Sequence, residues 1–263
     1  MTAQRGDGGR QPYYPLLVQL NYDLLREVKA ALLQAHIDQN NNYASLVSFF
    51  AGKACKNHEA IVILAERGYG QDAGILLRSL VNLVINAYWL AKDPVTRLER
   101  YMDYDWILRS QSAGVGRSAD ALARLTPEIR ASMAALDAEI EKKAREAKQK
   151  HRYDRRGWSG KNIRDMAKEV GFQNYYDYAY RLLSNLEHSN SRSTTAYLEE
   201  AAGANRLNVG PGPKYVRVVL ATAYGLLIDL FALADKVLSL GLAQALDDAR
   251  QKAQVNKTAF TQD

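Results

Sequence analysis

The chain has 263 residues, 47% of them hydrophobic and 24% charged, so it is long enough to bury a core and has an ordinary soluble composition. This balance excludes wholesale disorder, and the single cysteine, Cys55, excludes an intramolecular disulfide framework and favours a reducing cytoplasm. The net charge of +6, with a pI near 9.2, leans toward polyanionic partners such as nucleic acids.

Helical periodicity runs through nearly the whole chain, and Pro and Gly stand at a few boundaries instead of recurring at the short spacing of an all-β protein. We therefore predict an all-α fold, a single helical bundle. In chain order, helices are expected over residues 16–37, 43–67, 72–92, 95–112, 126–151 and 158–171, from 174 onward, and over 215–242. Residues 203–214, GANRLNVGPGPK, are expected to form a loop.

The two longest apolar windows predict buried helices. The windows 73–91 and 218–234 are interrupted by Arg78 and Asp229, so neither offers the roughly 20 clean residues that a membrane span requires. The first belongs to the predicted helix 72–92, which is apolar nearly all round and is expected to run through the centre of the bundle.

A charged segment predicts an arm that projects from the bundle. Between residues 139 and 156 there are eight Lys or Arg against four Asp or Glu, with few large apolar side chains. We expect a solvated helical arm over about 117–157, inserted in one helical-bundle domain over 13–245. A disordered tail is expected over 1–12, which lack the features of a secretory signal, and a polar tail over 246–263.

The segment RLLSNLEHSN, residues 181–190, carries a narrow polar face opposite its leucines. The residues on this face are Arg181, Ser184, Asn185, His188, Ser191 and Arg192. Arginine presents a planar fork of donors that matches a phosphate, and histidine takes or gives a proton near neutral pH. The pair indicates metal-independent cleavage of RNA, whereas the alternative is the ordinary solvated face of a helix.

A second polar stripe crosses the apolar helix 72–92. Arg78, Asn82 and Asn86 recur every four residues, with Ser79 beside them. Because a buried arginine is costly unless it is paired or borders a wet cavity, two interpretations stay open. Either the seam lines one pocket with the face of residues 181–192, or an acid binds Arg78 as a structural partner. The candidate acids are Asp103, Asp105 and Asp177.

The remaining motifs indicate no metal and no other cofactor. Cys55 and His58 lie one helical turn apart, but the sequence offers no second pair of such ligands to complete a zinc site. A P-loop, a G-x-S-x-G elbow and a dinucleotide fingerprint are all absent from the sequence.

Three segments resemble a widespread bacterial family that is catalogued as a domain of unknown function. They are ERGYGQDAGILLRSLVNLVINAYWL (66–90), WSGKNIRDMAKEVG (158–171) and YDYAYRLLSNLEHSNSRS (176–193). Members share an arginine-serine pair on a central helix, a helix that opens with Trp and Gly and continues I-R-x-x-A, and a late Y-x-x-x-S-x-x-x-H helix. The resemblance covers most of residues 43–240. Relatives usually carry an acid four places after the central arginine, where this chain has Asn82.

The spacing Arg181-x6-His188 is also similar to the R-x4–6-H signature of HEPN domains, although the residue after the arginine, usually polar in that family, is Leu182 here. HEPN domains are helical bundles that dimerise and often act as metal-independent endoribonucleases in toxin–antitoxin and antiphage systems. The resemblance implies that Arg181 stabilises the scissile phosphate and that His188 is the general acid or base. The supporting residues would be Arg78, Asn82, Ser184, Asn185 and Arg192.

The function expected from these patterns is thus that of a cytoplasmic, HEPN-like endoribonuclease that forms a homodimer and has an RNA substrate. An antitoxin or another protein is a further possible partner, and no membrane partner is expected. The alternative, from a different class, is a non-catalytic helical module that binds a protein or a nucleic acid. A sensor that uses the Arg78 seam as an anion pocket is a third reading.

Overall fold

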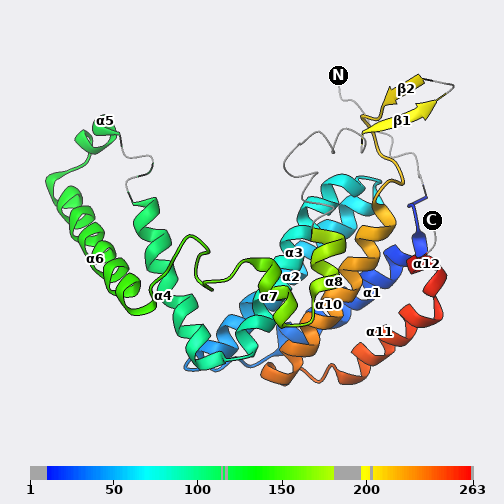
Figure 1. Cartoon of the computed structure of the whole chain (residues 1–263), viewed down its shortest axis with the longest axis horizontal. Helices are drawn as coiled ribbons and strands as arrows, with labels where there is room; N and C mark the ends of the chain where they lie inside the picture. The colour runs from blue at the N-terminus through cyan, green and yellow to red at the C-terminus, as the bar shows by residue number, and fades with distance from the viewer. Residues whose placement is uncertain (1–10, 114, 116–117, 181–196, 202–203, 262–263) are drawn as a thin grey trace. The chain divides into compact units, whose positions relative to one another are not determined.

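The structure is a computed structural model that describes residues 11–261 except 114, 116–117, 181–196 and 202–203. Apart from one hairpin of two strands, the regular structure in this part of the chain is helical, which confirms the all-α prediction. The first elements are α1 (Pro15–Gln34), α2 (Asn42–Glu66), α3 (Gly70–Ala91), α4 (Pro94–Ser112), α5 (Ala119–Ala123) and α6 (Pro127–His151) (Figure 1). They are followed by α7 (Ile163–Glu169), α8 (Gln173–Tyr175), the π-helical turn η1 (Tyr176–Tyr180), β1 (Leu198–Ala201), β2 (Ala204–Leu207), α10 (Val216–Leu238), α11 (Ala243–Val255) and α12 (Lys257–Thr261).

The chain divides into two compact units. Unit 1 comprises residues 1–89 and 167–263, and unit 2 comprises residues 90–166. We expected one domain with an arm over about 117–157. Unit 2 contains the described residues of this arm together with α4, which packs against α6. The number of domains stays a prediction.

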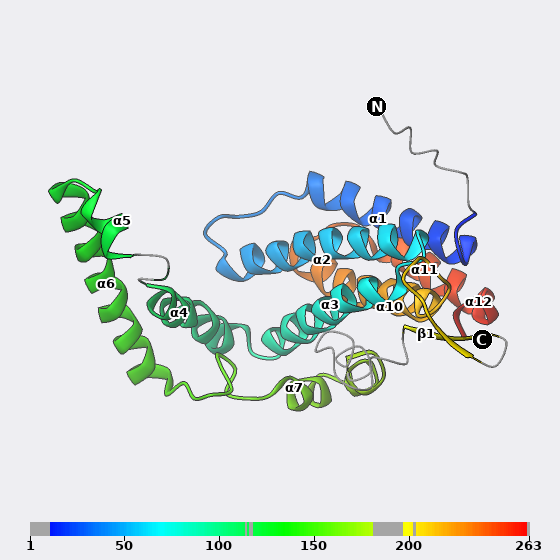
Figure 2. The same ribbon diagram turned by 90° about the horizontal axis from the view of Figure 1, so that it is seen from above.

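Unit 1 is built around α1, α2 and α10, which pack pairwise against one another (Figure 2). The apolar stripe predicted on the first helix faces this core, with Leu17 and Val28 fully buried. Helix α3 is also largely buried, since Leu77, Leu80 and Val81 have no exposed surface. Each such side chain contributes about 2 kcal/mol relative to an exposed position, so apolar burial is the main force that holds the bundle together.

Side chains at helix starts explain several boundaries. The Asn41 side chain accepts a hydrogen bond from the Ala44 amide at the start of α2, and Asp93 caps α4 in the same way, with Pro94 in its first turn. Thr126 caps α6, as its sequence predicted. These caps satisfy amides that have no partner within the helix.

The C-terminal part of unit 1 differs from the prediction. The polar tail expected over 246–263 is helical as far as Thr261, in α11 and α12. Leu246 and Ala249 lie three residues apart on one face and are buried, and the Tyr224 hydroxyl of α10 donates to the Ala249 carbonyl at 3.1 Å. A few apolar residues on one face therefore suffice to dock this polar helix on the bundle.

The segment 203–214, predicted as a loop, begins with strand β2 within its described residues. β2 pairs antiparallel with β1, with Leu198 opposite Leu207 and Glu199 opposite Arg206. The prediction of a loop was wrong for Ala204–Leu207 because pairing with β1 supplies backbone hydrogen bonds that the segment cannot make alone.

In the described part of the chain, helices α3 and α10 are long and apolar enough to cross a membrane, judged by length and composition. In each case 61% of the tested window is buried inside the protein, and core helices of soluble proteins pass the same test. Two helices of this kind are thus only weak evidence for a protein that spans a membrane.

Unit 2 is a hairpin of helices in which α4 and α6 run antiparallel. Its small core consists of Ile107, Ala144 and Ala147, and the rings of Tyr104, Trp106 and Tyr153 pack against it. The Lys143 ammonium lies 4.4 Å from the centre of the Trp106 ring. Aromatic rings and long charged side chains thus cover a core with few large aliphatic residues.

Candidate functional site

Most of the predicted site lies outside the described residues. This holds for Arg181, Ser184, Asn185, His188 and Arg192.

The other two predicted residues, Arg78 and Asn82, lie one turn apart on α3, and both are partly buried, as is Asn86. The neighbouring Leu77 and Val81 have no exposed surface. The polar seam therefore borders the core of unit 1 and is not sealed inside it.

The three acids considered as partners of Arg78 all have other contacts. Asp103 binds Lys150 and His151, and Asp105 forms an ion pair with Arg109. Asp177 accepts a hydrogen bond from the Gln173 amide group at 3.1 Å.

The chain that leads to residue 181 is attached to α3 and α10 by aromatic side chains. The Phe172 ring meets the Tyr88 ring of α3 edge to face at 4.7 Å and lies 5.6 Å from the Tyr175 ring. The Tyr88 hydroxyl donates to the Asp229 carbonyl of α10 at 2.7 Å. The Tyr175 hydroxyl donates to Asp229 Oδ2 at 3.1 Å. Asp229 is therefore the point at which α3, α8 and α10 are joined.

Burial shifts the pKa values of Asp229 and Tyr175. Desolvation raises the pKa of the Asp229 carboxyl, and the hydrogen bond from Tyr175 and the charge of Arg250 counter only part of this shift. The pKa of Tyr175 is raised by its own burial and by the nearby carboxylate, so its hydroxyl stays protonated and acts as a donor. Gly225 makes this contact possible, because a Cβ at that position would lie 2.7 Å from the Tyr175 hydroxyl oxygen.

A hollow of about 250 Å³ opens beside this carboxylate. Its polar and aromatic lining comes from four helices and consists of Tyr175, Tyr224, Asp229, Arg250 and Phe260. The sequence pattern had shown Asp229 only as an interruption of an apolar helix. Burying a carboxylate in an apolar helix costs free energy, so an acid in such a helix often has a functional role. The position of Asp229 within the apolar window 218–234 was therefore the sequence signal that could have marked this site.

A buried polar pair occupies the core of unit 1. His58 of α2 and Asn21 of α1 have no exposed surface. The Asn21 amide group donates to the carbonyls of Leu17 at 2.7 Å and Leu220 at 3.3 Å, which ties α1 to α10. Burial lowers the pKa of His58 to about 4, and the backbone carbonyls of Asn21 and Ala223 counter the shift only in part. His58 is thus a neutral core residue.

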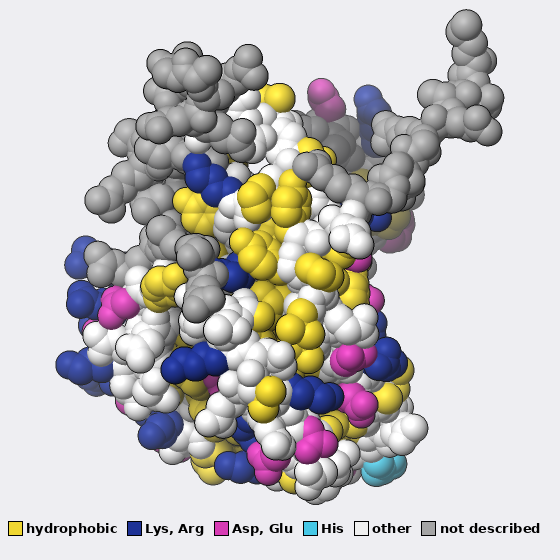
Figure 3. Space-filling model, turned by 90° about the vertical axis from the view of Figure 1, so that its right-hand side faces the viewer, with side chains coloured by type: hydrophobic (Ala, Val, Ile, Leu, Met, Phe, Trp, Pro, Cys, Tyr) yellow, Lys and Arg dark blue, Asp and Glu magenta, His cyan; other side chains and the backbone are white. Residues whose placement is uncertain are grey.

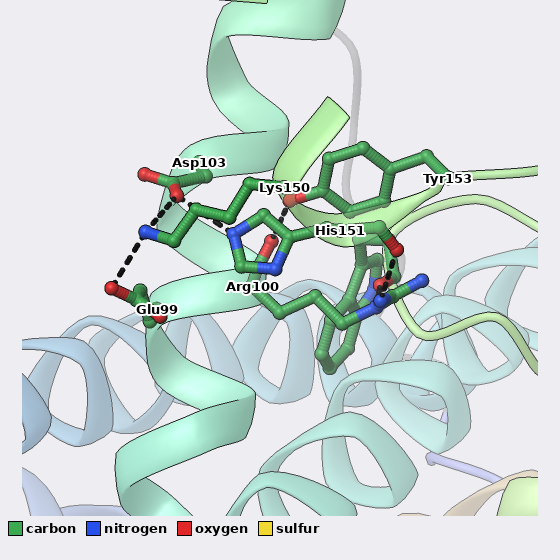
Figure 4. Close-up of polar contacts among 7 residues, drawn as sticks. Glu99, Arg100, Asp103, Lys150, His151 and Tyr153 are labelled. Atoms are coloured by element: carbon green, nitrogen blue, oxygen red, sulfur yellow. Dashed lines mark hydrogen bonds and ion pairs between the residues drawn. The ribbon is translucent and has the colours of Figure 1, made fainter. Parts of the chain in front are cut away.

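Figure 4 shows a polar cluster in unit 2 that crosslinks α4 and α6. Asp103 Oδ2 lies 2.7 Å from His151 Nε2 and 3.1 Å from Lys150 Nζ, which also binds Glu99 at 2.6 Å. An imidazole on a carboxylate is half of an acid–base pair. Here, however, the lysine shares the same oxygen, so the arrangement fits a structural tie between the two helices.

Arg100 closes this cluster on its other side. Its guanidinium donates to the carbonyls of His151, at 2.7 Å, and Trp158, and it lies 4.9 Å from the centre of the Tyr153 ring (Figure 4). The Tyr153 hydroxyl in turn donates to the Arg100 carbonyl at 2.6 Å. One side chain thus holds the end of α6 and the segment that follows it.

We expect Arg100→Lys to loosen unit 2. A lysine cannot reproduce the planar fork, so one carbonyl loses its donor at a cost of about 1–3 kcal/mol. Hydrogen exchange of the amides at the end of α6 is expected to quicken accordingly. Arg109→Lys is the matched control, because Arg109 forms an exposed pair with Asp105 within one helix, and such pairs are worth about 0.5 kcal/mol or less. Equal exchange in the two variants would contradict this role of Arg100.

Neither the curated proteins nor the solved structures include a significant match to this chain. A family model does match residues 44–205, more than half of the sequence, and spans α2 to β2. The matched region contains the Arg78 seam, the whole of unit 2 and the segment 181–190. The chain therefore belongs to the family described as "family of unknown function (DUF5677)".

Proposed function

We propose that the protein is a metal-independent endoribonuclease whose catalytic pair is Arg181 and His188. The observation that carries the proposal is the placement of this pair on one narrow polar face of a leucine-rich segment. His188 takes the proton of an RNA 2′-hydroxyl, whose oxygen attacks the adjacent phosphorus. Arg181 stabilises the charge on the phosphorane, and His188 gives its proton to the 5′-oxygen as the bond from this oxygen to phosphorus breaks. The products are a 2′,3′-cyclic phosphate end and a 5′-hydroxyl end.

Features of the described residues support a site of this kind in unit 1. Phe172 and Tyr175 attach the chain to α3 and α10 shortly before residue 181. The seam of Arg78 and Asn82 borders the core and offers donors that suit an anion. The positive net charge favours an RNA backbone as ligand. We propose that the enzyme works in the cytoplasm as a homodimer, in a toxin or antiphage-defence setting.

Cleavage assays test the assignment directly. Purified protein is incubated with labelled single-stranded and structured RNA in EDTA, and the ends of the products are identified by mass spectrometry. We expect His188→Ala and Arg181→Ala each to lower the rate by about 100-fold or more, while both keep the wild-type circular dichroism. His36→Ala, at an exposed position, is the matched control and should cleave normally. Full activity in both site variants would rule out this catalytic pair.

A second candidate function, a non-catalytic interaction module, is favoured by one feature of the surface. Figure 3 shows hydrophobic side chains that gather along the middle of one face, with side chains of both charges, Lys and Arg as well as Asp and Glu, beside them. Contiguous apolar patches on a folded protein commonly bind a partner. If no RNA is cleaved by the wild type, while the protein forms a stable complex with a protein partner, this second function replaces the first.

Light scattering tests the homodimer independently, and a monomer at micromolar concentration would contradict it.

A further inference from the structure

We propose that the hollow beside Asp229 in unit 1 is a binding site for one nucleotide, either free or as an unpaired residue of an RNA strand. The carboxylate would accept hydrogen bonds from the edge of the base, the aromatic wall would pack on the face of the base, and Arg250 would bind the phosphate. The inference does not depend on RNA cleavage, and none of the groups involved belongs to the predicted catalytic pair.

The first argument is that the carboxylate is fixed in place before any ligand arrives. Tyr175 holds Asp229 Oδ2 at 3.1 Å, and Tyr88 holds the backbone carbonyl of the same residue at 2.7 Å. In the described part of the chain, the Tyr175 hydroxyl is the one donor to this carboxylate. A preorganised acceptor that lines a cavity recognises a donor group at little entropic cost.

The second argument is the character and size of the hollow. The aromatic wall of the hollow consists of Phe260 of α12 and Tyr224 of α10, whose ring centres lie 5.5 Å apart with their planes inclined by 58°. Tyr224 is buried, so the partly exposed Phe260 supplies the ring on which a base would pack, and Ile228 and Ala253 add apolar surface. The volume of about 250 Å³ lies just below the roughly 300–1,000 Å³ typical of sites for drug-sized ligands. The space therefore suits a single small ring system. Proteins bind unpaired bases by stacking on such rings and by hydrogen bonds to the base edges.

The third argument is the charge at the rim. Arg250 lines the hollow, its side chain is 47% exposed, and its positive charge acts on the Asp229 carboxyl. Its ion pair with Asp247 at 2.6 Å lies on the exposed face of α11 and uses one arm of the guanidinium. The hollow thus combines an acceptor, an aromatic wall and a cation. A nucleotide offers the matching donor edge, flat face and phosphate.

Direct binding measurements test the site. The probes are the four ribonucleoside 5′-monophosphates, the same nucleosides without phosphate, and a 2′-O-methyl RNA tetramer, which cannot undergo attack by a 2′-hydroxyl. We expect saturable binding by calorimetry, tighter for adenine, guanine or cytosine, which present amino groups, than for uracil. Tighter binding of the monophosphates than of the tetramer identifies a free nucleotide as the ligand, and the reverse identifies RNA. No binding of any probe by the folded protein at millimolar concentration overturns the proposal.

Variants locate the ligand within the protein. In Asp229→Asn the Tyr175 hydroxyl still has an oxygen to bind, but an amide donor replaces the acceptor that faces the base, so affinity should fall about 10-fold or more. Arg250→Gln should lower the affinity for the nucleotides and leave the affinity for the nucleosides unchanged, because only the nucleotides carry a phosphate. Ala253→Leu should fill the cavity and abolish binding. The matched control is Asp248→Asn, an exposed acid on the same helix that does not line this hollow, and it should bind as the wild type does. Wild-type affinity in both Asp229→Asn and Ala253→Leu would place the ligand elsewhere and overturn the proposal.

Discussion

Between about pH 7 and pH 4.5, the wild-type protein is expected to lose about 2 kcal/mol more of its unfolding free energy than a His58→Leu variant. The pKa of His58 is about 4 in the folded protein and near 6.5 in the unfolded chain. Because the folded pKa is the lower one, the unfolded state takes up the proton first. The contribution of neutral His58 to the unfolding free energy is therefore complete above about pH 6.5 and is lost as the pH falls toward 4.

Denaturant unfolding monitored by circular dichroism over this pH range measures the effect. Carboxylates with lowered pKa values, such as Asp103, also destabilise the protein in acid, but they are common to both proteins and cancel in the comparison. His36→Leu is the matched control, because His36 is exposed, and it should keep the full pH dependence of the wild type. If His58→Leu and the wild type lose stability in parallel, His58 is not the group that titrates.

Gly70→Ala is expected to destabilise unit 1 by about 3 kcal/mol. Gly70 opens α3 where the chain crosses the start of α10. A Cβ at this position would overlap the carbonyl oxygen of Lys214 and lie 2.6 Å from the amide nitrogen of Val216. Both are backbone atoms, so neither can turn away as a flexible side chain would. The Gly212 amide also donates to the Gly68 carbonyl at 2.9 Å, which fixes the two segments against each other.

The matched control for Gly70 is Gly52→Ala in the middle of α2. No neighbouring atom lies within 4 Å of a Cβ added there, so the alanine should stabilise the helix by about 0.5–1 kcal/mol. Thermal unfolding, together with hydrogen exchange of the α10 amides, measures both changes. A Gly70→Ala protein as stable as the wild type would mean that α3 and α10 separate here without cost.

The sequence predicted structure best where a feature depends only on residues within one helix. The apolar stripe of α1, the capping threonine of α6 and the apolar character of α3 each depend on residues within one helix, and all three predictions are confirmed. The patterns were least informative where a segment depends on a distant partner. Strand β2 needs β1, and α11 becomes part of the bundle because Leu246 and Ala249 meet α10.

The candidate site shows the same division. The all-α fold and the family follow from the sequence, because helical spacing is a local property. The polar face over residues 181–192 stays a prediction, since it lies outside the described residues. The contact of Asp229 with Tyr175, 54 positions away in the chain, and that of Asp103 with His151, 48 positions away, form only when the chain folds. Burial and desolvation act through neighbours in space. The raised pKa of Asp229 and the lowered pKa of His58 therefore exist only in the folded bundle.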